Sequence, residues 1–557
     1  MLDVDYQLID TEDKRAEIIQ KLLTSEILSI DTETTGTEPM DAELVGMSFS
    51  DAENRAYYVP VPAEREEVLK IVNEFRPLFE NEKSMKVGQN IKYDMIILQN
   101  YGVQVKGKLF DTMLAHYVLQ PEQKHNTETI AETLHQYNVL KPRLKETGVE
   151  DLFYNIEMPL VPVLAEMEMT GVRLDTDALA ETSKVLTERM HQIEQNIYGL
   201  AGHEFNIASP KQVGEVLFGE MKIVEKPKKT KTGQYVTSEE VLQQLRSKAP
   251  IVDHILEHRG LKKLLGTYVD ALPKLINPRT GHIHTTFNQA VTATGRLSSS
   301  NPNLQNIPVR TDFGRRVRAC FVPLREGDVF VSADYSQIEL RLLAHLSGDE
   351  HLVAAFNSGA DFHASTASRV FGIPVEEVTP ELRSRAKAVN FGIVYGQQAF
   401  GLSQSLGVPF GEAKDMIDRY FEAYPGVRAY LDATVEQARE RGYAETMFGR
   451  KRHIPELHAG NANLRGFGER TAMNHPMQGS AADIIKLAMI EVSRRLREEG
   501  FAAKLLIQVH DELDFSVPRG EIEALSAMVR EVMEGVVELK VPLIADVSNA
   551  PTWAEAH

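Results

Sequence analysis

The stretch KLLIQVHDELDFSVP (504–518) constrains the fold of this chain more than any other. Two apolar runs flank a short polar turn, a pattern that predicts two strands joined by a tight connection. The turn holds two adjacent acids, Asp511 and Glu512. Like charges side by side cost free energy unless a cation compensates them, so we expect one of the two to face the working side of the sheet.

A second acidic strand end stands far away in the sequence. VFVSA (329–333) reads as a strand that ends at Asp334, and the helix that follows carries Glu339. A single carboxylate at a strand end is more often a cap or a surface charge. Asp334 and Asp511 on neighbouring strands, however, suit two Mg²⁺ ions ~3.5–4 Å apart, which together clamp the attacking and leaving oxygens of a phosphoryl transfer. Mg²⁺ is held by few carboxylates plus substrate phosphates, which matches this sparse ligand set.

Four residues of LRSRAKAVNFGIVYG recur at every fourth position: Arg383, Lys387, Phe391 and Tyr395. This spacing predicts a slowly winding stripe on one face of a helix. Two cations one turn apart suit a triphosphate, and the two aromatic rings beyond them suit a base. Taken alone, the stripe is also typical of an amphipathic helix with two solvated cations and two core rings.

Length and composition bound the organisation of the chain. Its 557 residues exceed the ~250–300 at which a single hydrophobic core stops growing, so several domains are expected. The one cysteine, Cys320, excludes an intrachain disulfide, which fits a reducing compartment. The first residues, MLDVDYQLIDTEDKR, lack the apolar region of a secretory signal, and no apolar run approaches the ~20 residues that span a bilayer.

The net charge of −19, read alone, argues against a nucleic-acid partner, because phosphate binding is driven by lysine and arginine. The charge is segregated, however. Four basic stretches lie in this acidic chain, at 226–231, 314–325, 383–387 and 449–453. A single run of this kind is usually a solvated face, but four together indicate a basic groove with an acidic exterior.

Together these motifs resemble those of the family A DNA polymerases. DYSQIELR (334–341), the stripe over 383–395 and VHDEL (509–513) are similar, in that order, to motifs A, B and C of the family. TGRLSSSNPNLQNIPVR (294–310) and NHPMQGSAADIIK (474–486) are also similar to bacterial members. The resemblance covers essentially the whole chain, as the large (Klenow-like) portion of those bacterial members.

The resemblance implies a role for each matching position of the polymerase motifs. Asp334 and Asp511 are implied as ligands of two Mg²⁺ ions, with Glu512 in support, and Lys387 as a proton donor to the leaving pyrophosphate. Glu339 is implied to block a ribose 2′-hydroxyl, and Phe391, where a tyrosine is the alternative, implies discrimination against dideoxynucleotides. The implied nucleotide-binding positions are Arg383, Lys387, Phe391, Tyr395, Glu339 and His363.

The same resemblance implies that the partners are primer–template DNA and deoxynucleoside triphosphates. The positions implied to contact DNA are Arg296, Asn303, Gln305, Arg470, Asn474, Gln478 and His510. Arg296 and Gln478 are suitable donors for the degenerate acceptor pattern of the minor groove. The expected setting is a monomer in the bacterial cytoplasm, associated with the nucleoid and not with a membrane.

The implied fold is multidomain, α/β and α+β. A ribonuclease H-like 3′→5′ exonuclease domain precedes a right-hand polymerase domain, and the alternation of strand-like and helix-like segments over 1–140 agrees with an α/β start. In that range the sequence predicts strands at EILSIDT (26–32), LVGMSFS (44–50) and AYYVPV (56–61) and an amphipathic helix at EREEVLKIVNEFRPLFE (64–80).

Farther along the chain, KPKKTKTGQYVT (226–237) predicts a flexible tip between helices and VFVSADYS (329–336) a strand. Residues 361–500 are predicted to be mostly helical, and EIEALSAMVREVMEGVV (521–537) is predicted to be the last helix. The expected divisions are 1–150 for the exonuclease-like domain, 151–280 for the thumb and lead-in helices, 281–345 for the first part of the palm, 346–490 for the fingers and the return to the palm, and 491–557 for the last part of the palm. No 5′-nuclease domain is expected before residue 1.

The stretch DTETTG (31–36) opens the exonuclease-like domain. The resemblance implies Asp31, Glu33 and Asp94 as ligands of Mg²⁺ or Mn²⁺, with Asp94 in the second exonuclease motif, VGQNIKYDMIIL (87–98). The family's fourth ligand and a water-orienting tyrosine come from a later Y-x3-D motif. We find no such motif, because Lys141 follows Tyr137 at that spacing and Met158 follows Tyr154.

The sequence therefore predicts a domain that is folded or partly folded but poor at proofreading. Asp111 does not supply the missing carboxylate, because its position in FDT predicts a helix cap. Two alternatives to a DNA polymerase are a single-subunit RNA polymerase and a catalytically inert primer–template binding protein. Glu339 argues against the first, and the intact set Asp334, Asp511, Arg383 and Lys387 argues against the second. Weak RNA-templated synthesis stays open.

Overall fold

The computed structural model describes residues 3–126 and 129–556. The chain forms two compact units. The first consists of Met1–Thr170, Thr286–Ser299 and Val331–Ser548, and the second of Gly171–Thr285, Ser300–Phe330 and Asn549–His557. Each unit is described by itself. Within the described ranges, no helix combines the length and the apolar content needed to cross a membrane.

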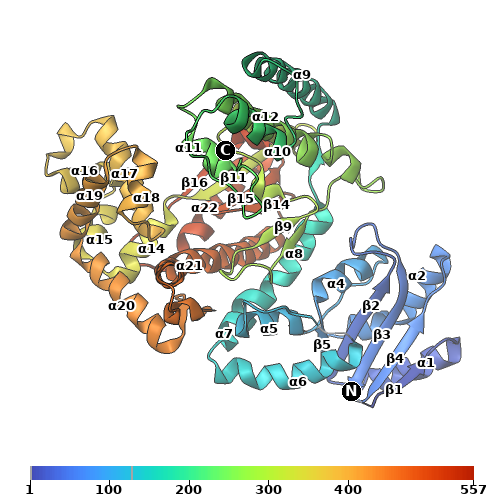
Figure 1. The fold of residues 1–557 in the computed structure, drawn as a ribbon. Helices are drawn as coiled ribbons and strands as arrows, with labels where there is room; N and C mark the ends of the chain where they lie inside the picture. Colours follow the sequence, from blue (N-terminus) through green and yellow to red (C-terminus); the bar gives the residue numbers. More distant parts are fainter. Residues whose placement is uncertain (1–2, 127–128, 557) are drawn as a thin grey trace. The chain divides into compact units, whose positions relative to one another are not determined.

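The first unit begins with a six-stranded mixed sheet in the order β1-β4-β3-β2-β5-β6 (Figure 1). Its central strand, β2, is antiparallel to β3 and parallel to β5. The runs predicted as strands at 26–32, 44–50 and 56–61 are confirmed as β2, β3 and β4. The strand bounds are β1 (Asp5–Leu8), β2 (Ile27–Thr34), β3 (Leu44–Ala52), β4 (Arg55–Pro60), β5 (Met85–Gly88) and β6 (Leu109–Asp111).

The helices of this domain are α1 (Glu12–Leu22), α2 (Arg65–Glu74), α3 (Arg76–Phe79), α4 (Ile91–Asn100), α5 (Thr112–Leu119) and α6 (Ile130–Glu146). The helix predicted over 64–80 is broken at Phe75 into α2 and α3. Pro77 explains the break, because it lacks a backbone N–H and is tolerated only in the first turn of a helix. Beyond α6 the chain continues through α7 (Glu150–Leu152), the π-helical turn η1 (Phe153–Glu157) and α8 (Met158–Thr170).

A four-stranded sheet in the order β14-β15-β11-β16 forms the centre of the remaining body. Its strands are β11 (Val329–Tyr335), β14 (Lys504–Val509), β15 (Glu512–Val517) and β16 (Ala545–Ala550). The strands predicted at 329–336 and 504–518 are confirmed. Strand β16 was not predicted, because four of the six residues of ADVSNA are alanine, aspartate or asparagine, which are depleted in strands. Helix α22 (Ile522–Gly535), predicted as the last helix, is followed by a further short helix, so that expectation was wrong.

Between β11 and β14 the chain is mostly helical, as predicted. The elements are α14 (Ile338–Ser347), α15 (Glu350–Asn357), α16 (Phe362–Phe371), α17 (Pro380–Val394), α18 (Ala399–Leu406), α19 (Phe410–Ala423), α20 (Pro425–Arg441), the hairpin β12 (Tyr443–Glu445) and β13 (Lys451–His453), and the long α21 (Ala462–Glu498). Helices α14 to α20 share one apolar core with Met477 of α21. A short pair, β8 (Thr286–Asn288) and β9 (Ser298–Ser300), precedes them in the chain.

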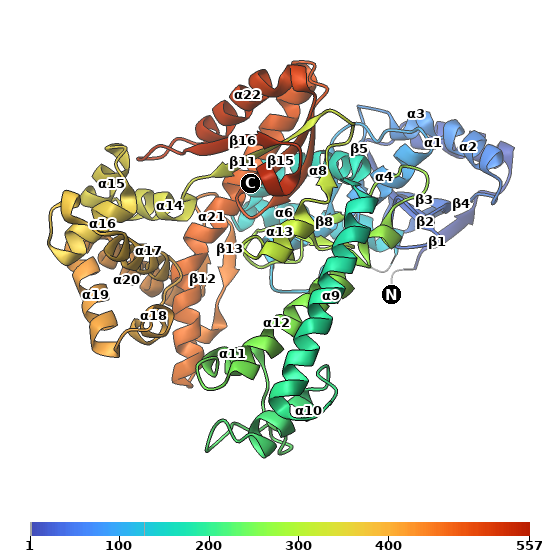
Figure 2. The same cartoon turned by 90° about the horizontal axis from the view of Figure 1, so that it is seen from above.

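The second unit contains α9 (Thr176–Ala201) packed along α12 (Pro250–Leu264), as Figure 2 shows. The segment 226–237, predicted as a tip between helices, lies before α11 (Glu239–Gln244) and forms a turn closed by a bridge between Lys229 and Tyr235. The other elements are α10 (Pro210–Gly214), α13 (Asp312–Arg318), the pair β7 (Arg173–Leu174) and β10 (Phe321–Val322), and α23 (Trp553–Ala556).

Candidate active site

The two acids predicted to bind metal lie at the same edge of the four-stranded sheet. Asp334 is the penultimate residue of β11, and Asp511 lies in the turn between β14 and β15. The backbone N–H of Tyr335 donates to the carbonyl oxygen of Asp511 at 3.0 Å, which ties the end of β11 to that turn. The sheet therefore brings together the end of β11 and the β14–β15 turn, which lie far apart in the sequence.

The electrostatics of Asp511 fit a cation. Burial raises the pKa of Asp511, and Arg296 and His510 only partly oppose that rise. A desolvated carboxylate of this kind is stabilised by a nearby positive ion, so the donor chemistry suits a divalent metal. Within the described ranges, no three or more histidine, cysteine, aspartate or glutamate side chains gather as a metal cage. Two carboxylates that rely on substrate oxygens for the other ligands are consistent with that finding.

Glu512 has a different environment from Asp511. It is 3% exposed and accepts a hydrogen bond from Ser332 Oγ at 3.0 Å. The same hydroxyl contacts Asp514, which is fully buried. The sequence interpretation missed Ser332 and Asp514, although acids at alternate positions of one strand were a usable signal because they share a face. Asp511, which is only partly buried, is therefore the more accessible member of the adjacent acidic pair.

Glu339, on the first turn of α14, forms an ion pair with Arg296 at 2.9 Å. Burial, and next Asp511, raise the pKa of Glu339 to about 7, although Arg296 opposes them. With its amide oxygen turned toward the guanidinium, Gln478 accepts from both terminal nitrogens of Arg296 at 3.2 Å. Three residues predicted to contact nucleotide or DNA therefore form one polar cluster near Asp511.

The stripe on α17 departs from an ordinary amphipathic face at Tyr395, whereas Phe391 packs against the apolar core. Lys387 is exposed, and Tyr395, at the C-terminal end of the helix, is 49% exposed. Arg383 Nε donates to Asp361 at 2.8 Å, which leaves the two terminal nitrogens of the guanidinium out of that contact. Phe391 is only partly buried, and its ring centroid is 5.8 Å from that of His363. The hypothesis that both aromatic rings of the stripe lie in the core is therefore wrong for Tyr395.

His363 lies close to Arg383 and Lys387, the two cations of α17. It lies on α16, and burial followed by Arg383 and Lys387 lowers its pKa to about 4. The structure therefore brings together His363, Arg383, Lys387 and Phe391, four of the residues that the sequence assigned to nucleotide binding. A neutral histidine beside two cations is an arrangement suited to a polyanionic ligand.

Arg470, Asn474 and Gln478 follow one another at every fourth position of α21, so they share one face of that helix. Arg470 packs against Gly396, just beyond the C-terminal end of α17. A Cβ added at Gly396, whose φ is +67°, would lie 3.2 Å from Arg470 Cγ. Glycine is needed there both for the left-handed conformation and for this close approach.

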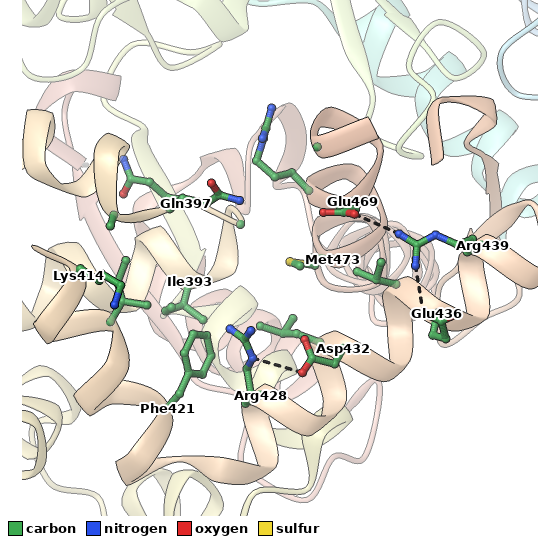
Figure 3. A pocket seen from close by; sticks show the side chains of 18 residues that line it. Ile393, Gln397, Lys414, Phe421, Arg428, Asp432, Glu436, Arg439, Glu469 and Met473 are labelled. Carbon is green, nitrogen blue, oxygen red and sulfur yellow. Dashed lines mark hydrogen bonds and ion pairs between the residues drawn. The ribbon is translucent and has the colours of Figure 1, made fainter. Parts of the chain in front are cut away.

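A cavity of about 520 Å³ opens between the end of α17 and helices α19, α20 and α21 (Figure 3). Its apolar wall includes Ile393, Phe421 and Met473. Its charged residues are largely paired. Arg439 contacts Glu436 and Glu469 at 3.0 Å, and Arg428 contacts Asp432 at 3.2 Å. Arg470 also lines the cavity, so it continues the face of α21 that the sequence assigned to DNA.

Two of the predicted DNA contacts, Asn303 and Gln305, lie in the second unit. Asn303 caps a 3₁₀ turn by accepting from the backbone N–H of Gln305 at 3.0 Å, and Tyr268 donates to the Asn303 carbonyl at 3.1 Å. The remaining one, His510, is exposed in the turn beside Asp511.

Three predicted or adjacent site positions have positive φ angles without being glycine: Asn90 (55°), Gln337 (53°) and His510 (52°). Such conformations are uncommon for ordinary side chains and concentrate at functional sites. His510 is held by a hydrogen bond from Gln508 Nε2 to its carbonyl at 2.5 Å. Residue type alone does not reveal this backbone feature.

The exonuclease-like carboxylates lie on β2 and α4. Burial and Glu33 raise the pKa of Asp31 to about 7. Burial, and next Asp31, raise the pKa of Asp94 well above its usual value. Thr32 donates to Asp94 Oδ1 from its backbone N–H at 3.0 Å and from its hydroxyl at 2.5 Å. Asp31 therefore interacts electrostatically both with Glu33, which is exposed, and with Asp94, which is buried.

The residues tested for the missing fourth ligand have other roles. Asp111 caps α5, as predicted, by accepting from the backbone N–H of Met113 at 2.9 Å. It also accepts from Asn90 and Ile91 at the start of α4. Tyr137 is 3% exposed and packs edge-on against Phe110. These side chains belong to the helix ends and the core of the domain.

Two of the basic stretches contain arginines that are not at the surface. Arg318 is 2% exposed, and its guanidinium lies 4.0 Å from the centre of the Trp553 ring. Arg450 is also 2% exposed and pairs with Glu157 and Asp483. The prediction that these stretches contribute to a basic groove is therefore wrong for Arg318 and Arg450.

Comparison with known proteins identifies the families of the two domains. The model of DNA polymerase family A matches residues 176–555, and the model of the 3'-5' exonuclease matches residues 6–191. The predicted order of an exonuclease domain followed by a polymerase domain is confirmed.

Several relatives are similar over most of the chain. DNA polymerase I of Pseudomonas aeruginosa is 41% identical over 610 aligned positions, covering 100% of this chain and 66% of that protein. DNA polymerase I of Geobacillus stearothermophilus is 42% identical, covering 94% of this chain and 63% of that protein. The chain thus spans slightly less than two thirds of the length of these curated relatives. The 610 aligned positions exceed the 557 residues, so the P. aeruginosa protein has segments that this chain lacks.

A solved structure is similar in fold as well. The POL domain of Pol1 from M. smegmatis, in complex with DNA primer-template and dNTP, superposes with a TM-score of 0.90 at 37% identity. The match covers 99% of this chain and 100% of that chain. With the family model, the curated relatives and this structure in agreement, the chain belongs to DNA polymerase family A.

Proposed function

We propose that the chain is a template-directed DNA polymerase that adds deoxynucleotides to a primer 3′-hydroxyl and releases pyrophosphate. The observation that carries the proposal is the meeting of two strand-end aspartates, Asp334 and Asp511, in the same unit as the cationic helix face of Arg383 and Lys387. Membership of the family supports it. So does the M. smegmatis neighbour, which holds a primer-template and a dNTP.

In this proposal Asp334 and Asp511 hold two Mg²⁺ ions, and Glu512 supports them from within the sheet. When bound, the ions lower the pKa of the attacking hydroxyl and neutralise the charge that develops on the phosphate oxygens. Arg383 grips the triphosphate through its free guanidinium edge. Lys387 adds a point charge and gives a proton to the leaving pyrophosphate. The protein otherwise acts by holding the reactants in line.

The DNA contacts complete the proposal. Arg296 and Gln478 read minor-groove acceptors of the primer–template end, and Tyr395 lies near the templating base. Arg470, Asn474 and His510 hold the strands close to the primer terminus. Asn303 and Gln305 are further proposed DNA contacts. The domain divisions at 150, 280, 345 and 490, the monomeric state and a place at the bacterial nucleoid belong to the same proposal.

The direct test is primer extension. With Mg²⁺, a primed template and four deoxynucleoside triphosphates, we expect products whose sequence follows the template. Omitting the metal or the template strand should abolish them. A preparation that binds primed DNA but extends no primer would instead identify an inert binding protein.

We also propose that proofreading is weak. Asp31, Glu33 and Asp94 are the proposed ligands of a site that also needs a fourth carboxylate and a tyrosine to orient the attacking water, and among the described residues no three carboxylates already gather as a metal cage. Three carboxylates retain one Mg²⁺ or Mn²⁺ ion weakly, but the second ion and the positioned water are lost.

Degradation of a single-stranded 3′ end measures this activity. With Mg²⁺ or Mn²⁺ we expect turnover at least about a hundredfold slower than polymerisation, because one metal and its water are poorly held. Asp94→Ala sets the background due to other nucleases, since it removes a ligand candidate. Turnover comparable to polymerisation that vanishes in Asp94→Ala would show that the domain is an active exonuclease.

Glu339 offers a test of sugar selection. Glu339→Ala is expected to raise the incorporation of ribonucleotides by roughly tenfold or more, because it removes the side chain that would clash with a 2′-hydroxyl. Glu339→Gln is the matched control, since it keeps the size and removes the charge. Ribonucleotide use by the unmodified chain at the rate of deoxynucleotides would instead favour an RNA polymerase.

A further inference from the structure

Asn390 is a buried polar residue to which the proposed mechanism assigns no role. It lies on α17 between Lys387 and Phe391 and has no exposed surface. Its side-chain Nδ2 approaches His363 Nδ1 at 2.9 Å and Thr366 Oγ1 at 3.2 Å. A fully buried amide held on two sides fixes the direction of its neighbours' hydrogens.

The direction of the hydrogen bonds follows from Thr366. This hydroxyl has one hydrogen and two acceptors in reach, the carbonyl oxygen of Phe362 at 3.1 Å, one turn earlier on α16, and Asn390 Oδ1 at 3.3 Å. We assign the hydrogen to the shorter contact, the one to Phe362. Its oxygen is then free to accept from Asn390 Nδ2. The second hydrogen of the same NH₂ group points at His363 Nδ1. Thr366 therefore orients the amide, and the amide makes Nδ1 of His363 an acceptor.

A neutral imidazole whose Nδ1 accepts carries its hydrogen on Nε2. Gln337 Nε2 lies 3.2 Å from His363 Nε2. Two N–H groups do not face one another in a hydrogen bond, so with Nε2–H present the Gln337 side-chain amide turns over and its oxygen accepts this hydrogen. Gln337 is only half-buried and stands three residues after Asp334. The chain of hydrogen bonds thus runs from the interior of the helical body toward the acidic edge of the sheet.

We propose that Asn390 is a positioning residue of the nucleotide site, which fixes His363 as a neutral donor whose Nε2–H turns from Gln337 to the triphosphate when a nucleotide binds. The proposal rests on the nucleotide-binding role proposed for His363. A neutral donor contributes a hydrogen bond to the phosphate without taking up a proton. Nucleotide affinity is then independent of pH near neutrality.

The charges around His363 agree with that state. Arg383 and Lys387 face it from α17, and Asp361 lies two residues earlier on α16. From α14 it meets Gln337, which is uncharged. The two cations disfavour an imidazolium, and Asp361 is itself engaged by Arg383 at 2.8 Å. Only the tautomer, and not the charge, is left for Asn390 to determine.

Asn390→Asp is the decisive variant. The introduced carboxylate accepts from Nδ1–H, so the neutral imidazole loses its hydrogen from Nε2. We expect the KM for deoxynucleotides to rise about tenfold at alkaline pH with little change in kcat, which corresponds to one lost hydrogen bond to a charged group. The introduced carboxylate also favours the imidazolium, so the pKa of His363 rises in the variant above the value of about 4 in the parent chain. Lowering the pH from about 8.5 to about 6 therefore protonates His363 in the variant alone and restores Nε2–H, so the KM of the variant should fall while that of the parent chain stays level.

Two further measurements keep the proposal open to refutation. Asn390→Leu fills the same space without any hydrogen bond and should raise KM moderately with no pH dependence. Nitrogen-15 NMR of histidine-labelled protein, with His363→Gln for assignment, reads the tautomer without any activity, and Nε2–H is expected in the parent chain. Absence of primer extension would overturn the proposed function and leave this NMR result standing. A level KM in Asn390→Asp, an equal loss of kcat in both variants, or an Nδ1–H tautomer would overturn the role of Asn390.

Discussion

Replacing Asp511 with alanine is expected to lower primer extension at least about a thousandfold, because several kcal/mol of transition-state stabilisation are lost with a metal ligand. Asp511 is the accessible acid of the β14–β15 turn, and burial already raises its pKa. Removing it leaves the hydrogen bond between Tyr335 and the backbone of residue 511 in place. The loss should therefore appear in catalysis and not in the fold.

Three measurements separate this loss from damage elsewhere. Binding of primed DNA to Asp511→Ala should stay within about threefold of the parent chain, because most of that affinity comes from phosphate contacts. Mn²⁺ binding, followed by electron paramagnetic resonance, should weaken. Asp546→Ala, which removes an exposed aspartate from strand β16 of the same sheet, should extend primers normally. Retained extension by Asp511→Ala would refute the two-metal assignment.

The sequence predicted the elements whose apolar pattern is locally complete. β11, β14 and β15 are continuous apolar runs, and the structure has them where the pattern indicates. β16 was missed because ADVSNA is polar and becomes a strand only through pairing in the finished sheet. The break between α2 and α3 depended on a single proline inside an otherwise helical pattern. Local chemistry was therefore sufficient to predict β11, β14 and β15, whereas tertiary pairing decided β16.

The candidate site divides in the same way. Asp334, Asp511 and the α17 stripe carry charge at readable spacings, so the sequence pointed to them. Asn390 and Thr366 are ordinary helix residues in the sequence, and they become informative only because both are fully buried beside His363. Arg318 and Arg450 show the opposite error. Each stands in a basic run, yet each is enclosed by partners that lie far away in sequence, Trp553 for the first and Glu157 for the second.

Arg450 belongs to a buried network of four charges in the first unit. Glu157, at the end of η1, accepts from Lys486 Nζ at 2.6 Å and pairs with Arg450, which also contacts Asp483 at 2.7 Å. All four side chains are 2% exposed or less. Gln289 donates to the remaining Glu157 oxygen at 2.9 Å, and Thr446 donates to Asp483 at 2.8 Å. The network joins η1 and the β12–β13 hairpin to α21, the helix that carries Arg470, Asn474 and Gln478.

Replacing Glu157 with glutamine is expected to lower the free energy of unfolding by about 3–5 kcal/mol, because two buried cations then share one carboxylate. Burial raises the pKa of Glu157, but Lys486 and Arg450 outweigh it and lower that pKa to about 2. A depressed folded-state pKa stabilises the fold above the ordinary value of 4.5 and loses that effect as the pH falls toward 2. The gap between the parent chain and Glu157→Gln, measured by thermal or urea unfolding, should therefore be full at neutral pH and close in acid.

The matched control is Glu491→Gln, which breaks a glutamate–arginine pair on the surface of α21. Exposed pairs of this kind contribute only about 0–1 kcal/mol, so the control should change stability little. A double variant, Glu157→Gln with Lys486→Met, removes one charge of each sign and leaves Arg450 paired with Asp483. It should be more stable than Glu157→Gln alone, since no buried cation is left without a counter-charge. If Glu157→Gln lost no more stability than Glu491→Gln, the four charges would not hold α21 to the rest of the unit, and the position of its DNA-facing side chains would need another cause.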